Sequence, residues 1–385
     1  MPQNKCIAVV ASLYPSGKAL YRGGFVHTRV AEYIKKGEKV KVFVPAREES
    51  EYEFEGVRVR RAPVQRIVHF LEKCDVVMLH LVHLSLTPEL DGAVVYRYLL
   101  RESVPTVFFV HGYEAQRAVV SLRSEFSLAR LRSSLGLLYH DLFYIPKMRR
   151  IILRFLETHP AVRFVTVSNW MLEEVKRSIG IDLRPKAVVI PNGINTSRFR
   201  FEYRWQDRHR FLSLRPLVLG GKYAVDLAVK TMPYLPKEVV LDLYGKGRDA
   251  AKIRRIMEKQ ALQGRLNLVE TFVPNAELPK LFAGHGGYYA VTRMDAQGVS
   301  MCEAMASGLA VVSFRTTGIP EFVKHGETGL LAKPYDVKEA AGLIETLVTD
   351  KNLYTRLVEN ARRFIESIDI SITAAKELEV VESLI

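Results

Sequence analysis

The sequence predicts an α/β protein with two doubly wound parallel-sheet domains that face each other across a cleft. A chain of 385 residues exceeds what one hydrophobic core usually supports. Short β-branched runs alternate with helical stretches of roughly 10–20 residues, which is typical of parallel sheets covered on both faces. Periodicity is lost after Gly193, near the midpoint. We therefore expect domains at 1–193 and 194–365, and a last helix, 366–385, that returns to the first domain.

The expected strands are the short apolar runs. In the first domain they cover 6–12, 39–45, 75–81, 105–112, 163–169 and 186–193, and in the second 209–216, 238–245, 265–270, 286–292 and 309–314. Ligands of such folds bind outside the carboxyl ends of the strands. Residues that directly follow a strand are therefore the first candidates for a site.

The composition, 48% hydrophobic and 25% charged, is that of a globular chain without membrane-spanning segments. The net charge of +14 is uneven: residues 1–190 hold 29 Lys and Arg against 19 Asp and Glu, and the remainder 27 against 23. This excess indicates an anionic partner for the first half, or else a solvated arginine-rich surface. Cys6, Cys74 and Cys302 form no metal or disulfide pattern, which favours the cytoplasm.

One helical region, 121–157, mixes aliphatic and aromatic residues with many arginines and one lysine. This mixture suits a helix that lies on an anionic membrane surface. The alternative is a helix pair that packs on its own sheet while the arginines reach into water. The sequence leaves both open.

Two acids flank a glycine loop and a helix start in the stretch 292–314, which contains Asp295, Gly298 and Glu303. Ser300 and Glu303 have capping-box spacing, which predicts a structural role. The same helix start also presents the free N–H groups of Val299 and Ser300 to an anion. Asp295 could accept hydrogen bonds from a polyol beside that anion.

Two cations lie at the start of the second domain. Arg215 ends a strand, and Lys222 follows a Gly-Gly turn before a helix. Together they could clamp a diphosphate, Arg215 by its fork and Lys222 as a point charge. The alternative is that both are solvated surface residues.

Two features of the first domain lie at carboxyl ends of strands. Gly23 and Gly24 stand between the first strand and its helix, where glycine permits close approach of a ligand or simply a tight turn. His111 follows the strand 105–110, and a histidine in such a place favours function over structure.

Other motifs are weak or missing. Gly245-x-Gly247-x-x-Ala250 resembles a dinucleotide fingerprint, but it lacks the third glycine and does not open a first βαβ unit. No P-loop, nucleophile elbow, zinc-protease motif or D-x-D pair occurs. A nucleic-acid partner is not expected, because basic and aromatic residues form no repeated platform.

Taken in order, several blocks of the chain resemble the retaining family-4 glycosyltransferases of the GT-B fold, also described as glycosyl transferases group 1. They are GGFVHTRVAEYIKKGEKVKVF, HGYE, VSNWMLEEVK, VIPNGINTSRF, RPLVLGGKYAVDLAVK, GKG, DAQGVSMCEAMASGLAVV and GIPEFVKHGETGLLAKPYD. The resemblance implies a metal-independent hexosyltransferase without a cofactor. It further implies a nucleotide-diphosphate sugar as donor, held by the second domain, and a glycan or lipid-linked acceptor, held by the first.

The resemblance also implies roles for the candidate residues. The donor diphosphate would meet Arg215, Lys222 and the N–H groups of Val299 and Ser300 that follow Gly298. Glu303 would bind the ribose hydroxyls, Asp295 the sugar hydroxyls and His111 the transferred sugar, with Gly23 and Gly24 near the diphosphate and the acceptor. Two positions depart from the family pattern: Asp295 replaces the usual glutamate, and Tyr223 replaces the usual glycine after Lys222.

Two other functions fit parts of the pattern. A GT-B nucleotide-sugar epimerase or hydrolase would use the same donor site without an acceptor. A non-catalytic basic module would bind a membrane surface and no nucleotide sugar. We expect a cytoplasmic protein, peripheral at the inner face of the membrane if 121–157 binds lipid.

Overall fold

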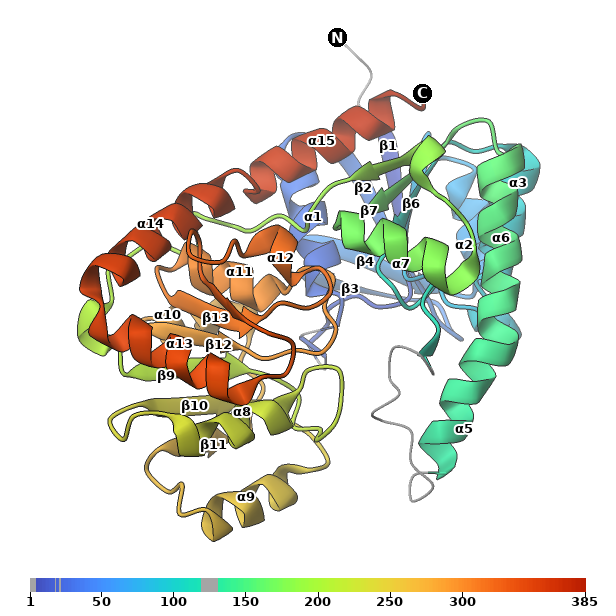
Figure 1. Ribbon diagram of the computed structural model, residues 1–385. Coiled ribbons are helices and arrows are strands. Elements are labelled where there is room, and N and C mark those ends of the chain that lie inside the picture. Colours follow the sequence, from blue (N-terminus) through green and yellow to red (C-terminus); the bar gives the residue numbers. More distant parts are fainter. Residues whose placement is uncertain (1–4, 18, 21, 119–130) are drawn as a thin grey trace. The chain divides into compact units, whose positions relative to one another are not determined.

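The computed structural model describes residues 5–17, 19–20, 22–118 and 131–385, the side chains of 131–134 excepted. These residues form two compact units. The N-terminal unit contains the residues up to 118, 131–193 and 370–385, and the C-terminal unit contains 194–369. Each is a parallel sheet with helices on both faces, as the sequence predicts (Figure 1).

The N-terminal unit is built on one sheet in the order β3-β4-β2-β1-β5-β6-β7-β8. Its strands are β1 (Cys6–Ala11), β2 (Lys39–Pro45), β3 (Ser50–Phe54), β4 (Val57–Ala62), β5 (Val76–His80), β6 (Thr106–Val110), β7 (Val162–Thr166) and β8 (Ala187–Val189). All neighbours pair in parallel except β3 and β4. Every residue of β1 is buried, because helices cover both of its faces.

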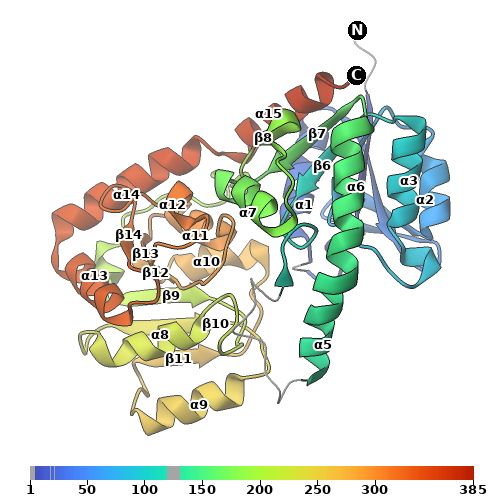
Figure 2. The same cartoon turned by 45° about the vertical axis from the view of Figure 1, so that its right-hand side comes forward.

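The described helices of this unit are α1 (Gly24–Lys35), α2 (Val64–Leu71), α3 (Ala93–Glu102), α5 (Leu131–Tyr139), α6 (Ile145–Thr158), α7 (Asn169–Ile179) and α15 (Ile370–Glu382). A π-helical turn, His140–Tyr144, joins α5 to α6. The helices α1 and α15 pack together over one face of the sheet, and α2, α3 and α6 pack over the other (Figure 2).

The helix α6 shows why this segment packs on its own sheet. Its buried residues Ile145, Met148, Ile152 and Phe155 recur at helical spacing. The ring of Phe155 contacts Phe108 of β6, with ring centroids 5.7 Å apart. The packing interpretation of 121–157 is therefore correct for this face of α6. Arg123 and Arg130, which also support the membrane interpretation, lie outside the described residues.

The C-terminal unit is built on a six-stranded parallel sheet in the order β11-β10-β9-β12-β13-β14. Its strands are β9 (Arg210–Leu214), β10 (Val240–Tyr244), β11 (Leu266–Val269), β12 (Gly287–Ala290), β13 (Ala310–Phe314) and β14 (Leu330–Ala332). Its helices are α8 (Val225–Thr231), α9 (Ala250–Lys259), α10 (Leu278–Phe282), α11 (Val299–Ala306), α12 (Ile319–Phe322), α13 (Val337–Thr349) and α14 (Lys351–Glu366).

Two apolar clusters show that this sheet is covered on both faces. Successive residues of β12 belong to different clusters. Tyr288 packs with α10, α11 and α12 on one face, and Tyr289 packs with α8 and α13 on the other. The order of the strands places β9 and β12 at the centre of the sheet. The segments that follow these two strands carry Arg215 and Asp295.

The sequence-based strand positions are confirmed within a few residues, but three strands were missed. The hairpin β3–β4 has charged, alternating residues, and its turn has Glu55 at φ 44° and Gly56 at φ 79°. Such a turn matches the twist of antiparallel strands. The strand β14 spans only three residues, which is too short for a visible pattern.

Candidate functional site

Arg215 is a buried cation at the carboxyl end of β9, with 5% of its surface exposed. Its Nε donates to the carbonyl of Val291 at 2.6 Å and its Nη1 to the carbonyl of Leu214 at 3.3 Å. Its Nη2 is buried and has no hydrogen-bond partner among the described residues. Because a buried charged donor without an acceptor is costly, this nitrogen marks a place for an anionic ligand.

Lys222 and Arg215 share an aromatic neighbour. The ammonium of Lys222 lies 4.8 Å from the ring centroid of Tyr223, and the guanidinium carbon of Arg215 lies 5.6 Å from it. Cation–π attraction of this kind holds two like charges near each other. Tyr223, the departure from the family pattern, therefore gathers the two cations that the sequence singled out.

The main chain joins Lys222 to the loop that contains Asp295. The carbonyl of Lys222 accepts the N–H of Arg293 at 2.6 Å and the N–H of Met294 at 3.3 Å. The guanidinium of Arg293 in turn binds both carboxyl oxygens of Asp226, at 2.9 and 2.7 Å. Sequence reasoning missed this pair, although an acid in the first turn of α8 was a possible signal.

The helix α11 begins at Val299, and its N-cap is Gly298, at φ 77°, with no side-chain cap. The capping-box interpretation of Ser300 is therefore wrong, because Ser300 lies inside the helix, and its hydroxyl accepts the Tyr288 O–H at 2.9 Å instead. The N–H groups of Val299 and Ser300 belong to the first turn, where no carbonyl of the helix can reach them. These N–H groups are thus open to an anion.

Asp295 shapes the loop before that helix. Its Oδ1 accepts the N–H of Gly298 at 2.9 Å and the N–H of Gln297 at 3.3 Å. Thr317 also holds it, with the Asp295 N–H donating to the Thr317 hydroxyl at 3.0 Å. One carboxyl oxygen is therefore engaged in the loop itself, which the sequence did not predict.

Glu303 lies one turn further along α11, with 7% of its surface exposed. Burial raises the pKa of its carboxyl to about 8, although Arg198 acts in the opposite direction. None of the hydrogen bonds found among the described residues ends on this carboxyl. A buried carboxyl that lacks a hydrogen-bond partner in the described part of the chain is suited to bind hydroxyl groups that a ligand brings.

Tyr288 links Glu303 to Arg215. Its pKa is raised by burial, lowered by Arg215 and raised again by Glu303, so that both charges lie near its phenol. The C-terminal unit thus brings together Arg215, Lys222, the loop from Asp295 to Gly298, the start of α11 and Glu303 at the carboxyl edge of its sheet.

The two glycines of the dinucleotide-like motif serve packing. A Cβ on Gly245 would lie 1.9 Å from the carbonyl oxygen of Arg215, and one on Gly247 would lie 2.4 Å from that of Leu217. The N–H of Arg215 donates to the carbonyl of Tyr244 at 3.0 Å. These glycines allow the β10 loop to hold the segment that carries Arg215.

The N-terminal unit brings Gly23 and His111 to the same edge of its sheet. Gly23 caps α1 at φ 69°, and a Cβ there would lie 2.3 Å from the carbonyl oxygen of Leu13. A Cβ on Gly24 would meet nothing within 4 Å. The ring of Phe25 lies 4.7 Å from the ring of His111, centroid to centroid.

His111 is a partly buried, neutral histidine. Burial, followed by the charge of Arg29, lowers its pKa to about 3. Its main-chain N–H and that of Gly112 donate to Oε2 of Glu114 at 3.3 and 3.1 Å. Burial raises the pKa of Glu114 to about 7. Sequence reasoning did not identify Glu114, although it lies three residues after His111.

Comparisons with known proteins agree with this architecture. The family description "Glycosyltransferase Family 4" matches residues 24–198, and "Glycosyl transferases group 1" matches residues 205–364. The chain belongs to the group 1/family 4 glycosyltransferases of the GT-B fold.

Solved structures of other proteins show the same fold. Anabaena HepE in complex with UDP and glucose has a TM-score of 0.72 at 15% identity, over 99% of this chain and 100% of that one. Sucrose-phosphate synthase from Thermosynechococcus elongatus has a TM-score of 0.72 at 16% identity, over 99% of both chains.

The matches to curated relatives cover only part of each protein. A sulfoquinovosyl transferase from Arabidopsis thaliana is 24% identical over 57% of this chain and 44% of its own length. A poly(glycerol-phosphate) alpha-glucosyltransferase from Bacillus subtilis is 27% identical over 41% of this chain and 22% of its own. The chain thus spans less than half the length of these two relatives.

Proposed function

We propose that this protein transfers a hexose from a nucleotide-diphosphate sugar to a lipid-linked or polysaccharide acceptor, with retention of the anomeric configuration. The observation that carries the proposal is the unpartnered Nη2 of Arg215 in the unit that also holds the open first turn of α11. A diphosphate supplies the acceptor oxygens that both features lack. The relatives named above include a glucosyltransferase and a structure with bound UDP, which supports the donor class.

The leaving diphosphate is stabilised by fixed positive charge in this proposal. Arg215, Lys222 and the N–H groups of Val299 and Ser300 are in place before the sugar bond breaks, so that little reorganisation is needed. No cluster of metal-ligating side chains is found among the described residues. We propose a metal-independent reaction because the protein itself supplies these cations.

The other candidate residues hold hydroxyl groups. Glu303 accepts hydrogen bonds from the ribose, and the free oxygen of Asp295 accepts one from the transferred sugar. His111 donates to the same sugar, and the turn at Gly23 and Gly24 admits the diphosphate and the acceptor. The leaving phosphate oxygen takes the proton of the acceptor hydroxyl on the face that it leaves, which gives retention.

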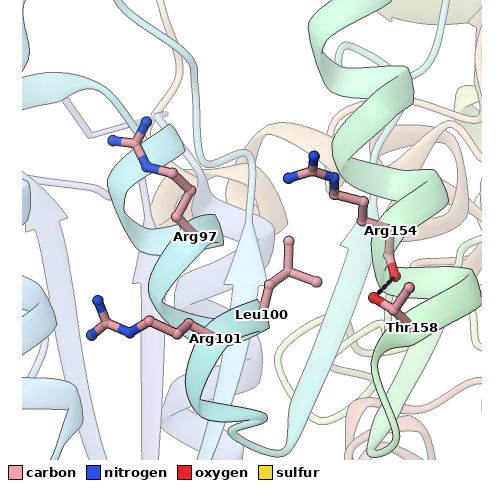
Figure 3. Close-up of a pocket in the computed structure, with 5 residues that line it drawn as sticks. All are labelled: Arg97, Leu100, Arg101, Arg154 and Thr158. Carbon is pink, nitrogen blue, oxygen red and sulfur yellow. Dashed lines mark hydrogen bonds between the residues drawn. The ribbon is translucent and has the colours of Figure 1, made fainter.

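The N-terminal unit offers a surface for an anionic acceptor or membrane. Leu135, Tyr139, Leu142 and Phe143 recur at helical spacing and are between 47% and 65% exposed. Arg97 and Arg101 of α3 and Arg154, near the C-terminal end of α6, line a surface pocket of about 360 Å³ (Figure 3). Exposed apolar residues together with cations favour contact with an anionic lipid surface.

No helix among the described residues is long and apolar enough to cross a membrane. We therefore propose peripheral contact at the inner face of the membrane. Cys6 and Cys74 lie next to each other as thiols, with the Cys6 Sγ donating to the Cys74 Sγ at 3.4 Å, which supports the reducing cytoplasm as the location.

Vesicle flotation tests the membrane contact. We expect recovery with phosphatidylglycerol vesicles but not with neutral phosphatidylcholine vesicles, and loss of recovery in the variant Leu142→Ser/Phe143→Ser. Ile34→Ser is the matched control, because Ile34 is 41% exposed on α1, on the opposite face of the sheet. Equal recovery with both lipids would contradict the proposal.

A thermal-shift series with UDP-, GDP- and ADP-sugars tests the donor class. One of them should raise the melting temperature, because ligand binding to the native state stabilises it. Glu303→Ala should remove this shift and the transfer activity while the fold persists. Product analysis with and without acceptor lipid separates transfer from hydrolysis or epimerisation of the donor, and the anomer formed shows whether configuration is retained.

A further inference from the structure

A buried histidine contacts His111 from the neighbouring strand. His80 is the last residue of β5 and is 1% exposed, and β5 pairs directly with β6. Its Nδ1 lies 3.1 Å from Nε2 of His111. The ring of Phe109 stacks on His80 at 4.0 Å between centroids, which fixes the orientation of the His80 ring. His111 therefore reaches its position with one ring nitrogen already engaged.

Both imidazoles are neutral. The pKa of His80 lies well below its usual value, because of burial first and then the neighbouring His111 and Arg29. Arg29 is itself buried on α1, and its Nε donates to Glu377 of α15 at 2.8 Å. A hydrogen bond between two neutral imidazoles has one donor and one acceptor, so that only two proton arrangements are possible.

The unpartnered nitrogen of His80 decides between these arrangements. Its Nε2 is buried and has no hydrogen-bond partner among the described residues. If His80 Nδ1 accepts, the proton sits on Nε2 as an orphaned buried donor. If His80 Nδ1 donates, Nε2 carries only a lone pair. Orphaned buried N–H groups are rarer than unsatisfied acceptors, and the positive charge of Arg29 favours the lone pair.

We propose that His80 is a positioning residue that donates from Nδ1 to His111 and thereby fixes the proton of His111 on its own Nδ1. His111 then presents a permanent N–H donor to an oxygen of the ligand. It accepts no proton during the reaction. The identity of that ligand, a donor sugar, rests on the proposed function, but the proton arrangement does not.

Nitrogen-15 NMR of the imidazole rings tests the arrangement in the free protein. The His111 signals are assigned by their loss in His111→Gln. We expect the pattern of a neutral ring with its proton on Nδ1, unchanged between pH 6 and pH 8. A proton on Nε2 of His111, or titration within this range, would overturn the proposal whether or not any nucleotide sugar binds.

Two substitutions of His80 test its effect on turnover. The side-chain amide of Asn lies near the position of Nδ1, so that His80→Asn keeps a donor for His111, whereas His80→Leu removes it. With the nucleotide sugar found by thermal shift, we expect His80→Asn within about threefold of the parent kcat and His80→Leu about 10- to 100-fold lower.

The affinity for the free nucleoside diphosphate should be the same in both variants, since the C-terminal unit binds it. Equal loss of kcat in His80→Asn and His80→Leu, with His111 still protonated on Nδ1, would contradict the positioning role. If His80→Leu does not fold, the NMR pattern of the parent protein and the kcat of His80→Asn still test the positioning role of His80. Absence of any nucleotide-sugar binding by the parent would contradict the proposed function alone.

Discussion

The candidate residues of the two units differ in charge. In the N-terminal unit, the buried His80 and the partly buried His111 are both neutral, and burial raises the pKa of Glu114 to about 7. In the C-terminal unit, Arg215 and Lys222 are permanent cations that share the ring of Tyr223. A neutral donor suits hydroxyl groups, whereas buried cations beside an open helix start suit phosphate. Under the proposed function, the C-terminal unit would bind the phosphates of the donor and the N-terminal unit hydroxyl groups.

Removal of the buried cation should have the largest effect on transfer. Arg215→Ala should lower kcat/KM by about 10²- to 10³-fold, because a preorganised charge on the leaving diphosphate is lost. The matched control is Arg356→Ala, at an exposed position of α14 in the same unit, which should leave kcat/KM unchanged. Steady-state kinetics with the identified donor measure both. A loss below threefold in Arg215→Ala would contradict the charged character of this site.

The pH dependence of donor affinity should be the next largest effect. The pKa of Glu303 in the free protein is about 8, and ribose hydroxyls donate to its ionised form. Below pH 8 the carboxyl of Glu303 must therefore lose a proton when the donor binds, so that the affinity for the donor rises with pH. It should be about 50-fold weaker at pH 6 than at pH 8 and flat above pH 9.

Calorimetric titration with a nucleotide sugar at several pH values measures this dependence, because the diphosphate diester does not titrate there. Glu303→Gln should bind weakly and without pH dependence. An affinity of the parent protein that falls as the pH rises would show that the protonated carboxyl is the binding form.

Asp295 offers a smaller and more specific test. Asp295→Asn keeps an oxygen for the N–H groups of Gln297 and Gly298 but removes the charge. We expect an unchanged melting temperature and a loss of roughly 10-fold in kcat/KM, the size of one weakened hydrogen bond to a sugar hydroxyl. Unchanged kinetics would mean that Asp295 only shapes the loop. Asp295→Ala should lower both stability and activity.

Substitutions of the adjacent residues Gly23 and Gly24 should have the smallest effect on transfer. Comparison of the two variants separates a role in packing from a role in ligand binding. Gly23→Ala places a Cβ against the carbonyl oxygen of Leu13 at a φ of 69°, and should destabilise the N-terminal unit by about 2 kcal/mol. Gly24→Ala meets open space and should retain the parent stability. Thermal unfolding measures both. Equal destabilisation by the two variants would contradict the conformational role of Gly23.

The fold could be predicted from the sequence because buried parallel strands are continuous apolar runs. The hairpin β3–β4 could not be predicted, because its strands are rich in charged residues and only one side of each strand faces the core. The site was predictable at Arg215, which directly follows a strand, and at the helix start after Gly298. The helix cap was mispredicted, because Ser300 has capping-box spacing but Gly298 adopts the left-handed conformation as N-cap, so that the helix already begins at Val299.

The remaining features of the candidate site depend on contacts between residues that lie far apart in the sequence. His80 and His111 lie 31 residues apart and meet only because β5 and β6 are neighbours in the sheet. Tyr288 pairs with Leu212 of β9, and the charges of Arg215 and Glu303 both act on its phenol. The contact of Tyr223 with Arg215 and Lys222 was not predicted, because it depends on the fold around it.

The central claim is that the C-terminal unit binds the diphosphate of a nucleotide sugar. Calorimetric titration of the parent protein with a nucleoside and with its diphosphate tests it most directly. We expect the diphosphate to bind at least about 100-fold more tightly than the nucleoside, because it makes two charge-assisted contacts. Arg215→Ala should remove most of this difference. Equal affinities for the nucleoside and the diphosphate in the parent protein would contradict it.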